Sequence, residues 1–347
     1  MRIGVMGAGA IGANVGGRLT QAGYDVTLID QWPQHVDAMK ARGLRLSGTA
    51  GDHVVPVRAL HLHEAQAIRD PFDAVFLAVK SYDTEWATMF AVRFLREPDG
   101  VIVSFQNGIN DERVAAIAGR GRTLGCVITF GAGLYEPGHA LRTDQIVEGR
   151  VNFKIGELDG RRTDRARRLA EIVNHVGPTE VTSNLAGERW AKLAQNAMGN
   201  AIAGLSGYGS AQLRTVPLVR RLEIYIAAET VRVARAAGVD IAPITGIAPQ
   251  RYVDASEGRG FAELDAEMAR RGSPATDLGR PSLLQDVLRG RRTEVVELNG
   301  QVAAEGRRLG VPTPVNEAVV REMNRHTVGE FTPDPRHLEP LARVLPE

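Results

Sequence analysis

Short apolar runs alternate with amphipathic, helix-like stretches over the first half of the chain. Each run is almost continuously apolar, as expected of a parallel strand that is buried on both faces. The predicted strands cover residues 3–6, 26–30, 73–79, 100–105 and 123–130, and predicted helices run up to residue 23 and over 34–41, 84–95 and 111–118, the last capped by Asp111. This alternation is typical of a doubly wound α/β sheet, so we expect an N-terminal Rossmann-type domain.

The pattern changes after residue 130. Short, closely spaced strand-like pieces over residues 131–156 predict antiparallel strands that continue the sheet. Brief strands are also predicted over 44–46, 53–57 and 179–182, with a helix over 161–175. Strand signals end near residues 183–187, which predicts a first domain over residues 1–184 and a second over 185–347.

The second domain has a helical pattern, and we expect it to be all-helical. The predicted helices cover residues 185–205, 217–237, 293–309 and 314–324. Thr313 is the expected N-cap of the last helix, with Pro314 at its first position. Residues 255–278 are rich in Gly, Arg, Glu and Ala, and they predict a mobile or partly helical insertion.

Composition narrows the class of protein. A chain of 347 residues can bury two cores, and no apolar run approaches the length that spans a membrane. The net charge of +1 favours neither nucleic acid nor a membrane surface as a partner. The sole cysteine, Cys126, cannot form an internal disulfide, and Met1-Arg2 leads directly into the first strand without room for a signal peptide. We therefore expect a cytoplasmic globular protein.

A glycine-rich turn joins the first predicted strand to the first predicted helix. It reads Gly7-Ala8-Gly9-Ala10-Ile11-Gly12. In this pattern the first glycine permits a tight turn, the second lets backbone N–H groups approach a pyrophosphate, and the third lets the helix pack close to its strand. Asp30 ends the second strand, 18 residues after Gly12, where an acid can bind a ribose diol. The pattern predicts a dinucleotide site; a glycine turn without a ligand is the alternative.

Two further polar residues follow predicted strands. Lys80 comes after the strand over 73–79, and Asn107 comes after the strand over 100–105. Ligands of open α/β sheets bind outside the carboxyl ends of the strands. We therefore expect Lys80 and Asn107 to lie at the same edge of the sheet as Gly7 and Asp30.

The second domain carries its own candidates for chemistry. Lys192, Asn196 and Asn200 recur at intervals of four, so they share one face of a helix. Asparagine is a poor helix former, which suggests that this face binds something, although a solvated face is the alternative. Ser282 and Glu294 are further candidates; Glu294 borders the buried stripe of its predicted helix and could equally be a partly exposed carboxylate.

The order and spacing of these pieces resemble those of the ketopantoate reductases (2-dehydropantoate 2-reductases) over nearly the whole chain. The matching segments are the glycine-rich turn, Ala78-Val79-Lys80, Gln106-Asn107-Gly108, Trp190-Ala191-Lys192-Leu193 with Asn196 and Asn200, Pro281-Ser282-Leu283-Leu284-Gln285-Asp286, and Arg292-Thr293-Glu294. The resemblance implies NADPH-dependent reduction of 2-dehydropantoate to pantoate, a step toward pantothenate and coenzyme A. The implied partner is a small-molecule 2-oxo acid.

The resemblance also implies roles for the matching residues. Lys192 is the implied general acid that protonates the carbonyl oxygen, and Glu294 is the carboxylate that orients Lys192 and the substrate hydroxyl. The other implied roles are substrate hydrogen bonds from Asn196 and Asn200, a substrate-carboxylate contact from Ser282, and contacts with the nicotinamide-ribose end of the cofactor from Lys80 and Asn107.

The chain departs from the family pattern at two places. Many members have a basic or small residue after the second strand, where this chain has Asp30. A carboxylate repels the 2′-phosphate of NADPH but accepts hydrogen bonds from a ribose 2′-OH, which predicts a preference for NADH. The alternative is that Asp30 is a turn residue that points away. The second departure is the insertion over 255–278, which could cover the substrate.

Other interpretations remain open on the sequence alone. A related NAD-dependent dehydrogenase could act on a different hydroxy or keto compound, including in the oxidative direction. A cofactor-binding regulator without turnover is less consistent with a proton donor at Lys192. His61 and His63 have no clustered partners, so we expect no metal site. We expect a homodimer, and the apolar helix over 217–237 could serve either as a core helix or as its interface.

Overall fold

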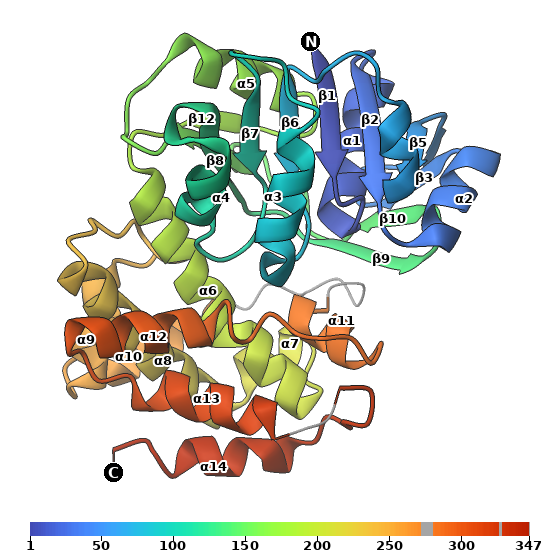
Figure 1. Ribbon diagram of the computed structural model, residues 1–347. Coiled ribbons are helices and arrows are strands. Elements are labelled where there is room, and N and C mark those ends of the chain that lie inside the picture. Colours follow the sequence, from blue (N-terminus) through green and yellow to red (C-terminus); the bar gives the residue numbers. More distant parts are fainter. Residues whose placement is uncertain (272–279, 326–327, 347) are drawn as a thin grey trace. The chain divides into compact units, whose positions relative to one another are not determined.

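The computed structural model describes residues 1–271, 280–325 and 328–346. The chain divides into two compact units, Met1–Leu185 and Ala186–Glu347. The first contains a mostly parallel sheet with helices, and the regular elements described in the second are all helices, so the predicted fold class is confirmed (Figure 1). No helix in the described ranges is both long and apolar enough to cross a membrane.

The main sheet of the first unit has eight strands in the order β12-β11-β8-β7-β6-β1-β2-β5. Its neighbouring strands are parallel except for β8 and β11, which are antiparallel. The strands are β1 (Arg2–Met6), β2 (Asp25–Asp30), β5 (Arg58–His61), β6 (Ala74–Leu77), β7 (Val101–Ser104), β8 (Thr123–Ile128), β11 (Phe153–Glu157) and β12 (Thr179–Val181).

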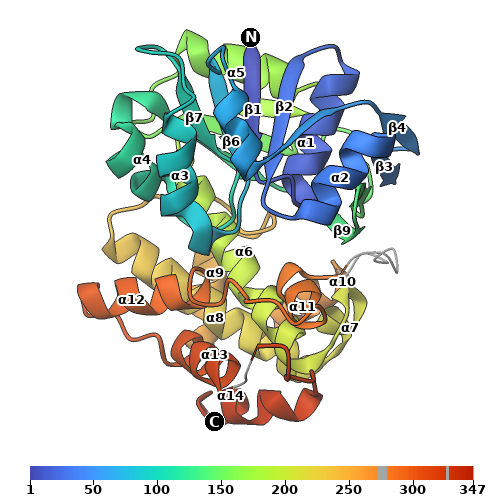
Figure 2. The same ribbon diagram turned by 45° about the vertical axis from the view of Figure 1, so that its right-hand side comes forward.

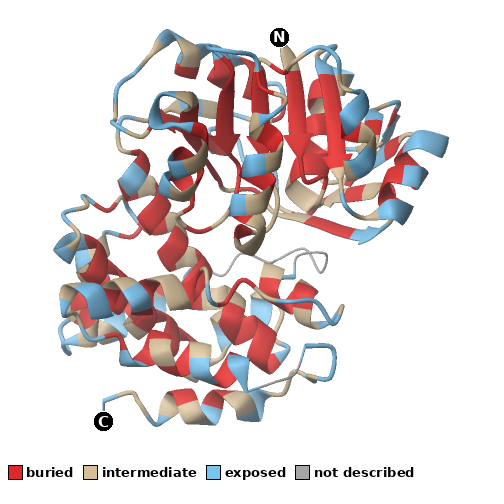
Figure 3. Cartoon of the chain, viewed as in Figure 1, coloured by how far each residue is buried: buried red, intermediate tan, exposed pale blue. Residues whose placement is uncertain are grey.

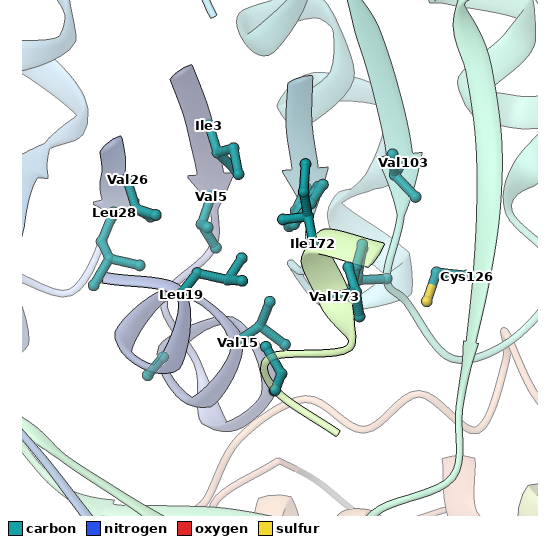
Figure 4. Close-up of a cluster of buried hydrophobic side chains, with 14 of the residues drawn as sticks. Ile3, Val5, Val15, Leu19, Val26, Leu28, Val103, Cys126, Ile172 and Val173 are labelled. Carbon is teal, nitrogen blue, oxygen red and sulfur yellow. The ribbon is translucent and has the colours of Figure 1, made fainter. Parts of the chain in front are cut away.

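Helices cover both faces of this sheet. They are α1 (Ala10–Gln21), α2 (Pro33–Arg42), α3 (Thr84–Val92), α4 (Asp111–Ala118) and α5 (Asp164–Val173), with short 3₁₀ helices at Leu62–Ala67, Ser81–Asp83 and Arg120–Arg122. Side chains of α1 and α5 pack with Ile3 and Val5 on one face, as Figure 4 shows, while α3 and α4 pack on the other face with Met6. Successive residues of a strand point to opposite faces, so one apolar run supplies both cores.

The expectation that residues 131–156 simply continue the main sheet is wrong in part. Only β11 joins that sheet, antiparallel to β8. The hairpin of β9 (Ala132–Glu136) and β10 (His139–Arg142) instead forms a second sheet with β3 (Leu44–Gly48) and β4 (His53–Val55), in the order β4-β3-β10-β9. β10 pairs in parallel with β3, far away in the chain, and local apolar patterning carries no information about such a partner.

Helix α1 packs between the two sheets, and two adjacent glycines allow this. A Cβ added at Gly16 would lie 2.3 Å from the side chain of Leu28 in the main sheet. A Cβ added at Gly17 would lie 2.8 Å from Leu44 and 3.0 Å from Leu46 in the second sheet. The glycines therefore permit a close approach that larger residues would prevent.

In the second unit the four predicted helices are present, with shifted ends in all but the last, and shorter helices that were not predicted lie between and after them. The helices are α6 (Leu185–Ser206), α7 (Ser210–Thr215), α8 (Pro217–Ala236), α9 (Pro249–Ser256), α10 (Phe261–Arg270), α11 (Ser282–Val287), α12 (Asn299–Leu309), α13 (Pro314–Asn324), a 3₁₀ helix at Pro335–Leu338, and α14 (Glu339–Ala342) (Figure 2). The predicted insertion is partly helical, as expected, through the end of α9 and α10. Residues 272–278 of this region lie outside the described part of the chain.

Helix α8 belongs to the core of the second unit. Its residues Leu222, Ile224, Ile226 and Val231 are completely buried within the single chain. Buried segments alternate with exposed ones along the helices of this unit (Figure 3). The apolar sides of α8 are therefore used inside the unit, and they give no independent argument for a dimer interface.

The structure corrects one predicted helix cap and confirms the position of the other. Helix α4 has Asn110 at its N-cap, and Asp111 is the first helical residue. Thr313 does occupy the N-cap of α13, but its side chain makes no capping hydrogen bond. The carboxylate of Glu229 on α8 accepts from the N–H groups of Val315 (2.8 Å) and Asn316 (2.9 Å) instead.

Candidate functional site

Four predicted site residues follow four neighbouring strands of the main sheet. The strands β7, β6, β1 and β2 lie side by side and are parallel. Gly7 and Asp30 stand at the ends of β1 and β2, and Lys80 and Asn107 stand three residues beyond β6 and β7. The topology therefore brings all four to the carboxyl edge of the sheet, where open α/β sheets bind ligands.

Each of the three positions in the turn requires glycine for a different reason. Gly7 has φ +90°, a conformation that side chains other than glycine rarely adopt. A Cβ added at Gly12 would lie 1.9 Å from the carbonyl oxygen of Gly7, so α1 can approach the turn only with glycine there. A Cβ added at Gly9 would meet no described atom within 4 Å, so packing does not explain this glycine.

The start of α1 is suited to an anion. Gly9 is its N-cap residue and provides no side-chain hydrogen bond to the helix. The first N–H groups of a helix have no partner within it, and the helix dipole adds a partial positive charge. Together with the open position at Gly9, these N–H groups fit the pyrophosphate of a dinucleotide.

Asp30 turns toward the glycine turn. Its Oδ2 accepts a 2.6 Å hydrogen bond from the N–H of Ala8, and its Oδ1 accepts a 2.8 Å hydrogen bond from the N–H of Trp32. The side chain of Asp30 therefore faces the glycine turn and does not point away from it. The side chain is partly exposed, and each oxygen keeps a lone pair for a further donor.

His35 is a buried neighbour of this turn that sequence reasoning missed. Its Nε2 lies 2.9 Å from the carbonyl oxygen of Ala8, and its Nδ1 accepts a 2.8 Å hydrogen bond from the N–H of Gly138. Burial lowers the pKa of His35, and the negative charge of Asp30 opposes this effect. The sequence signal for this role was a histidine five residues after Asp30, within α2. Its hydrogen-bond partner Gly138 is distant in the chain and could not be predicted.

Side chains also connect the loops that carry Lys80 and Asn107. Ser81 donates to the carbonyl oxygen of Asn107 (2.8 Å), and Gln106 Nε2 donates to the carbonyl oxygen of Val79 (3.2 Å). Asn110 Nδ2 donates to Ser81 Oγ (3.1 Å) and to the carbonyl oxygen of Asn107 (2.7 Å). These bonds order both loops at the carboxyl edge; Ser81, Gln106 and Asn110 were not predicted to do so.

In the second unit, Lys192, Asn196 and Asn200 lie within one uninterrupted helix, α6, at intervals of one turn. Lys192 Nζ donates to Gln195 Oε1 at 3.2 Å, and the residue is partly buried. Asn196 is buried, while Asn200 is partly exposed. The alternative interpretation, that this helix face is only solvated, is therefore wrong for Asn196.

Gly204 continues the same row of α6 and links it to Ser282. A Cβ added at Gly204 would lie 3.5 Å from the Cβ of Leu283, the neighbour of Ser282 in α11. The first turn of α11 thus packs on α6 one turn beyond Asn200. The hydroxyl oxygen of Ser282 is buried and has no hydrogen-bond partner among the described residues.

Glu294 is buried, but it does not lie on a helix as the sequence predicted. Helix α12 begins at Asn299, and Glu294 belongs to the turns that precede it. The β-branched residues Thr293, Val295 and Val296 lower the helix propensity of this segment. Asn299 anchors the segment to α6, because its Nδ2 donates to the carbonyl oxygen of Ala197 at 3.1 Å.

Helix α8 carries two buried carboxyl groups, those of Glu223 and Glu229. Burial raises the pKa of Glu229 to about 7, although the N–H groups of Asn316 and Val315 favour its ionised form. Burial also raises the pKa of Glu223 to about 7, opposed by the charge of Arg214. Glu223 Oε1 lies 3.6 Å from the position of a Cβ at Gly199, so this carboxyl group faces α6.

His61 and His63 form a stacked pair, with ring centroids 5.4 Å apart. His61 Nε2 lies 2.9 Å from Asp37 Oδ1. Within residues 1–271, 280–325 and 328–346, no group of three or more His, Cys, Asp and Glu side chains is arranged to hold a metal ion.

Comparison with known proteins identifies the two halves of the chain. Residues 3–160 match the family described as ketopantoate reductase PanE/ApbA, and residues 184–326 match its C-terminal domain. The 2-dehydropantoate 2-reductase of Archaeoglobus fulgidus is 32% identical over 321 residues, covering 92% of this chain and 95% of that protein.

Solved structures of similar fold cover the chain to the same extent. The 2-dehydropantoate 2-reductase of Geobacter metallireducens has a TM-score of 0.78 and 25% sequence identity, over 94% of this chain and 99% of that one. A D-mandelate dehydrogenase with NADH and anilino(oxo)acetate has a TM-score of 0.76 at 22% identity, over 92% of this chain and 96% of that one. The latter similarity concerns the fold alone.

Proposed function

The chain belongs to the ketopantoate reductase family of NAD(P)-dependent oxidoreductases, and on that premise we propose that it reduces 2-dehydropantoate to pantoate on the route to pantothenate and coenzyme A. The observation that carries the proposal is the row of Lys192, Asn196 and Asn200 on α6. It provides one cationic donor and two amides on a single helix face, with the buried Ser282 hydroxyl packed at its end.

Lys192 is the proposed general acid. Hydride addition to a ketone builds negative charge on the carbonyl oxygen, so an ammonium group aimed at that oxygen stabilises the transition state more than the ground state. Lys192 then donates its proton to the new alkoxide. Lys192 Nζ donates to Gln195 Oε1 on the same helix, which keeps the amine among the polar side chains of α6.

The neighbouring residues are proposed to hold the substrate. Asn196 and Asn200 would hydrogen-bond its polar groups, and the Ser282 hydroxyl would donate to its carboxylate. The unsatisfied Ser282 oxygen supports this role, because a buried hydroxyl without a partner is costly unless a ligand completes it. Glu294 would orient Lys192 and the substrate hydroxyl, and its anchored turn supplies a defined position.

The first unit would hold the cofactor, which supplies the hydride when bound. The N–H groups around Gly9, at the start of α1, would bind the pyrophosphate, and Lys80 and Asn107 would contact the nicotinamide-ribose end. Asp30 would accept from the adenosine ribose hydroxyls. We propose NADH as the preferred cofactor, because the fixed carboxylate of Asp30 repels a 2′-phosphate. NADPH is the family-typical alternative.

The experiment is a panel of 2-oxo acids, including 2-dehydropantoate, offered with NADH and with NADPH and followed at the nicotinamide absorbance. We expect the highest kcat/KM with 2-dehydropantoate. A higher kcat/KM with another 2-oxo acid would show that 2-dehydropantoate is not the preferred substrate. Efficient turnover only from a hydroxy acid with NAD⁺ would show that the enzyme works in the oxidative direction. Cofactor binding without any turnover would make the protein a regulator. A homodimer remains a further prediction, which light scattering of the purified chain tests.

A further inference from the structure

The peptide groups on both sides of Ala8 are held by side chains. The N–H of Ala8 donates to Asp30 Oδ2, and its carbonyl oxygen lies 2.9 Å from His35 Nε2. Ala8 itself is completely buried. These two contacts set the orientation of the backbone immediately before Gly9 and the first N–H groups of α1.

The hydrogen bonds determine which nitrogen of His35 carries the proton. The N–H of Gly138 can only donate, so Nδ1 must be the acceptor, and the carbonyl oxygen of Ala8 can only accept, so Nε2 must carry hydrogen. The buried ring is therefore neutral and donates to the glycine turn. The lowered pKa of His35 agrees with this state.

The ring is itself held firmly from two directions. Trp32 stacks on it, with centroids 5.5 Å apart and an interplanar angle of 21°. Gly138 has φ +76°, and a Cβ there would lie 2.9 Å from the Cβ of Ala38 on α2, so the turn of the β9–β10 hairpin packs closely on the helix that carries His35. The second sheet thus braces the histidine from the side opposite the glycine turn.

We infer that His35 is a positioning residue of the dinucleotide site, which holds the Ala8 carbonyl so that the N–H groups after it are directed toward the pyrophosphate. The inference rests on the cofactor use in the proposed function and adds the residue that orders the turn. His35 does not touch the cofactor in this role. It acts through the backbone, because the carbonyl of Ala8 and the N–H of Gly9 belong to one planar peptide group and move together.

Three variants of the full chain separate this role from general stabilisation. In His35→Gln the side-chain amide can reach the place of Nε2 and keep the bond to Ala8. In His35→Asn the shorter amide can replace only Nδ1 and keep the bond to Gly138. His35→Leu removes both. His139→Asn is the matched control. It removes an imidazole ring next to Gly138 in the β9–β10 hairpin, and the Nε2 of that ring contacts Ser47 Oγ (2.6 Å) and not the glycine turn.

The readout is the dissociation constant of ADP-ribose and of NADH, measured by calorimetry without substrate, beside the midpoint of thermal unfolding. We expect both constants to rise about tenfold in His35→Leu and His35→Asn, but less than about threefold in His35→Gln and His139→Asn. In the reductase assay, KM for NADH should rise while kcat at saturation stays within about twofold.

The inference is overturned if His35→Asn binds ADP-ribose as tightly as His35→Gln, or if His139→Asn weakens binding equally. Should His35→Leu fail to fold, the Gln and Asn pair still decides the question, since each keeps one of the two bonds. A wild-type chain that binds NADH but reduces no 2-oxo acid would refute the proposed function and leave this inference standing.

Discussion

The carboxylate of Asp30 accepts a 2.6 Å hydrogen bond from the backbone N–H of Ala8, in the middle of the glycine-rich turn. A second bond, from the N–H of Trp32, holds the other oxygen. The negative charge therefore has a defined position beside the expected cofactor site, and moving it would leave backbone donors without their partner.

This relationship predicts cofactor preference. We expect kcat/KM to be at least about tenfold higher with NADH than with NADPH, because one fixed charge repels the 2′-phosphate. Asp30→Asn keeps the size of the side chain and removes its charge, so the preference should shrink mainly through a lower KM for NADPH. Steady-state kinetics with both cofactors measure this. A wild-type preference for NADPH would refute the argument.

Replacing Lys192 should remove most of the chemistry and leave cofactor binding. We expect Lys192→Ala to lower kcat by about 10²–10⁴-fold, the usual contribution of a positioned proton donor, with the NADH dissociation constant unchanged. Lys40→Ala, which removes the exposed pair with Glu64, is the control and should retain full activity. Normal turnover by Lys192→Ala would show that the proton comes from elsewhere.

Alanine substitutions at two glycines of the same turn should affect different properties, stability at Gly12 and NADH affinity at Gly9. Gly12→Ala places a Cβ 1.9 Å from the Gly7 carbonyl oxygen, so we expect a loss of about 1–3 kcal/mol or more in the free energy of unfolding. Gly9→Ala meets no described atom within 4 Å, so stability should be retained while NADH affinity falls. Thermal unfolding and NADH titration distinguish the two. Unchanged NADH affinity in Gly9→Ala would contradict a pyrophosphate at this position.

Glu223 should make stability depend on pH. Burial raises its pKa from 4.5 to about 7, so the folded state binds the proton more tightly than the unfolded state. The resulting stabilisation, about 3 kcal/mol, is present below about pH 4.5 and is lost as the pH rises to about 7.

The matched variant is Glu223→Gln, which cannot ionise and keeps the shape of the side chain. Relative to the wild type, it should gain about 3 kcal/mol in free energy of unfolding between pH 4.5 and pH 8, as measured by urea unfolding. Taking the difference between the two proteins cancels the other titrating groups, including Glu229. An equal difference at both pH values would show that the carboxyl group titrates normally.

Helix α13 should depend on Glu229 and not on its own N-cap residue. Glu229→Ala leaves the buried N–H groups of Val315 and Asn316 without their acceptor, and we expect a loss of about 2–4 kcal/mol in the free energy of unfolding. Thr313→Ala should change it by less than about 1 kcal/mol, because the threonine side chain makes no capping bond. Denaturant unfolding of the two variants tests this; equal losses would contradict it.

The sequence alone was sufficient for the features that depend on near neighbours. Apolar runs predicted the strands of the main sheet except β5, which lies just beyond the strand predicted over 53–57. The order of the strands predicted that Gly7, Asp30, Lys80 and Asn107 lie at one edge, because parallel strands joined by helices must all end there. The four-residue interval between Lys192, Asn196 and Asn200 likewise predicted that they share one face of α6, because residues about one turn apart lie on the same side of a helix.

Only the tertiary structure decided the contacts between residues distant in the chain. The β9–β10 hairpin leaves the main sheet because β10 pairs with β3, His35 receives a donor 103 residues away at Gly138, and Glu229 caps a helix that begins 85 residues later. The apolar pattern of a strand does not identify the strand with which it pairs. Sequence signals for a helix cap likewise concern only residues next to the helix in the chain. Such partners are set by packing in three dimensions, where a buried donor must find whichever acceptor the fold brings to it.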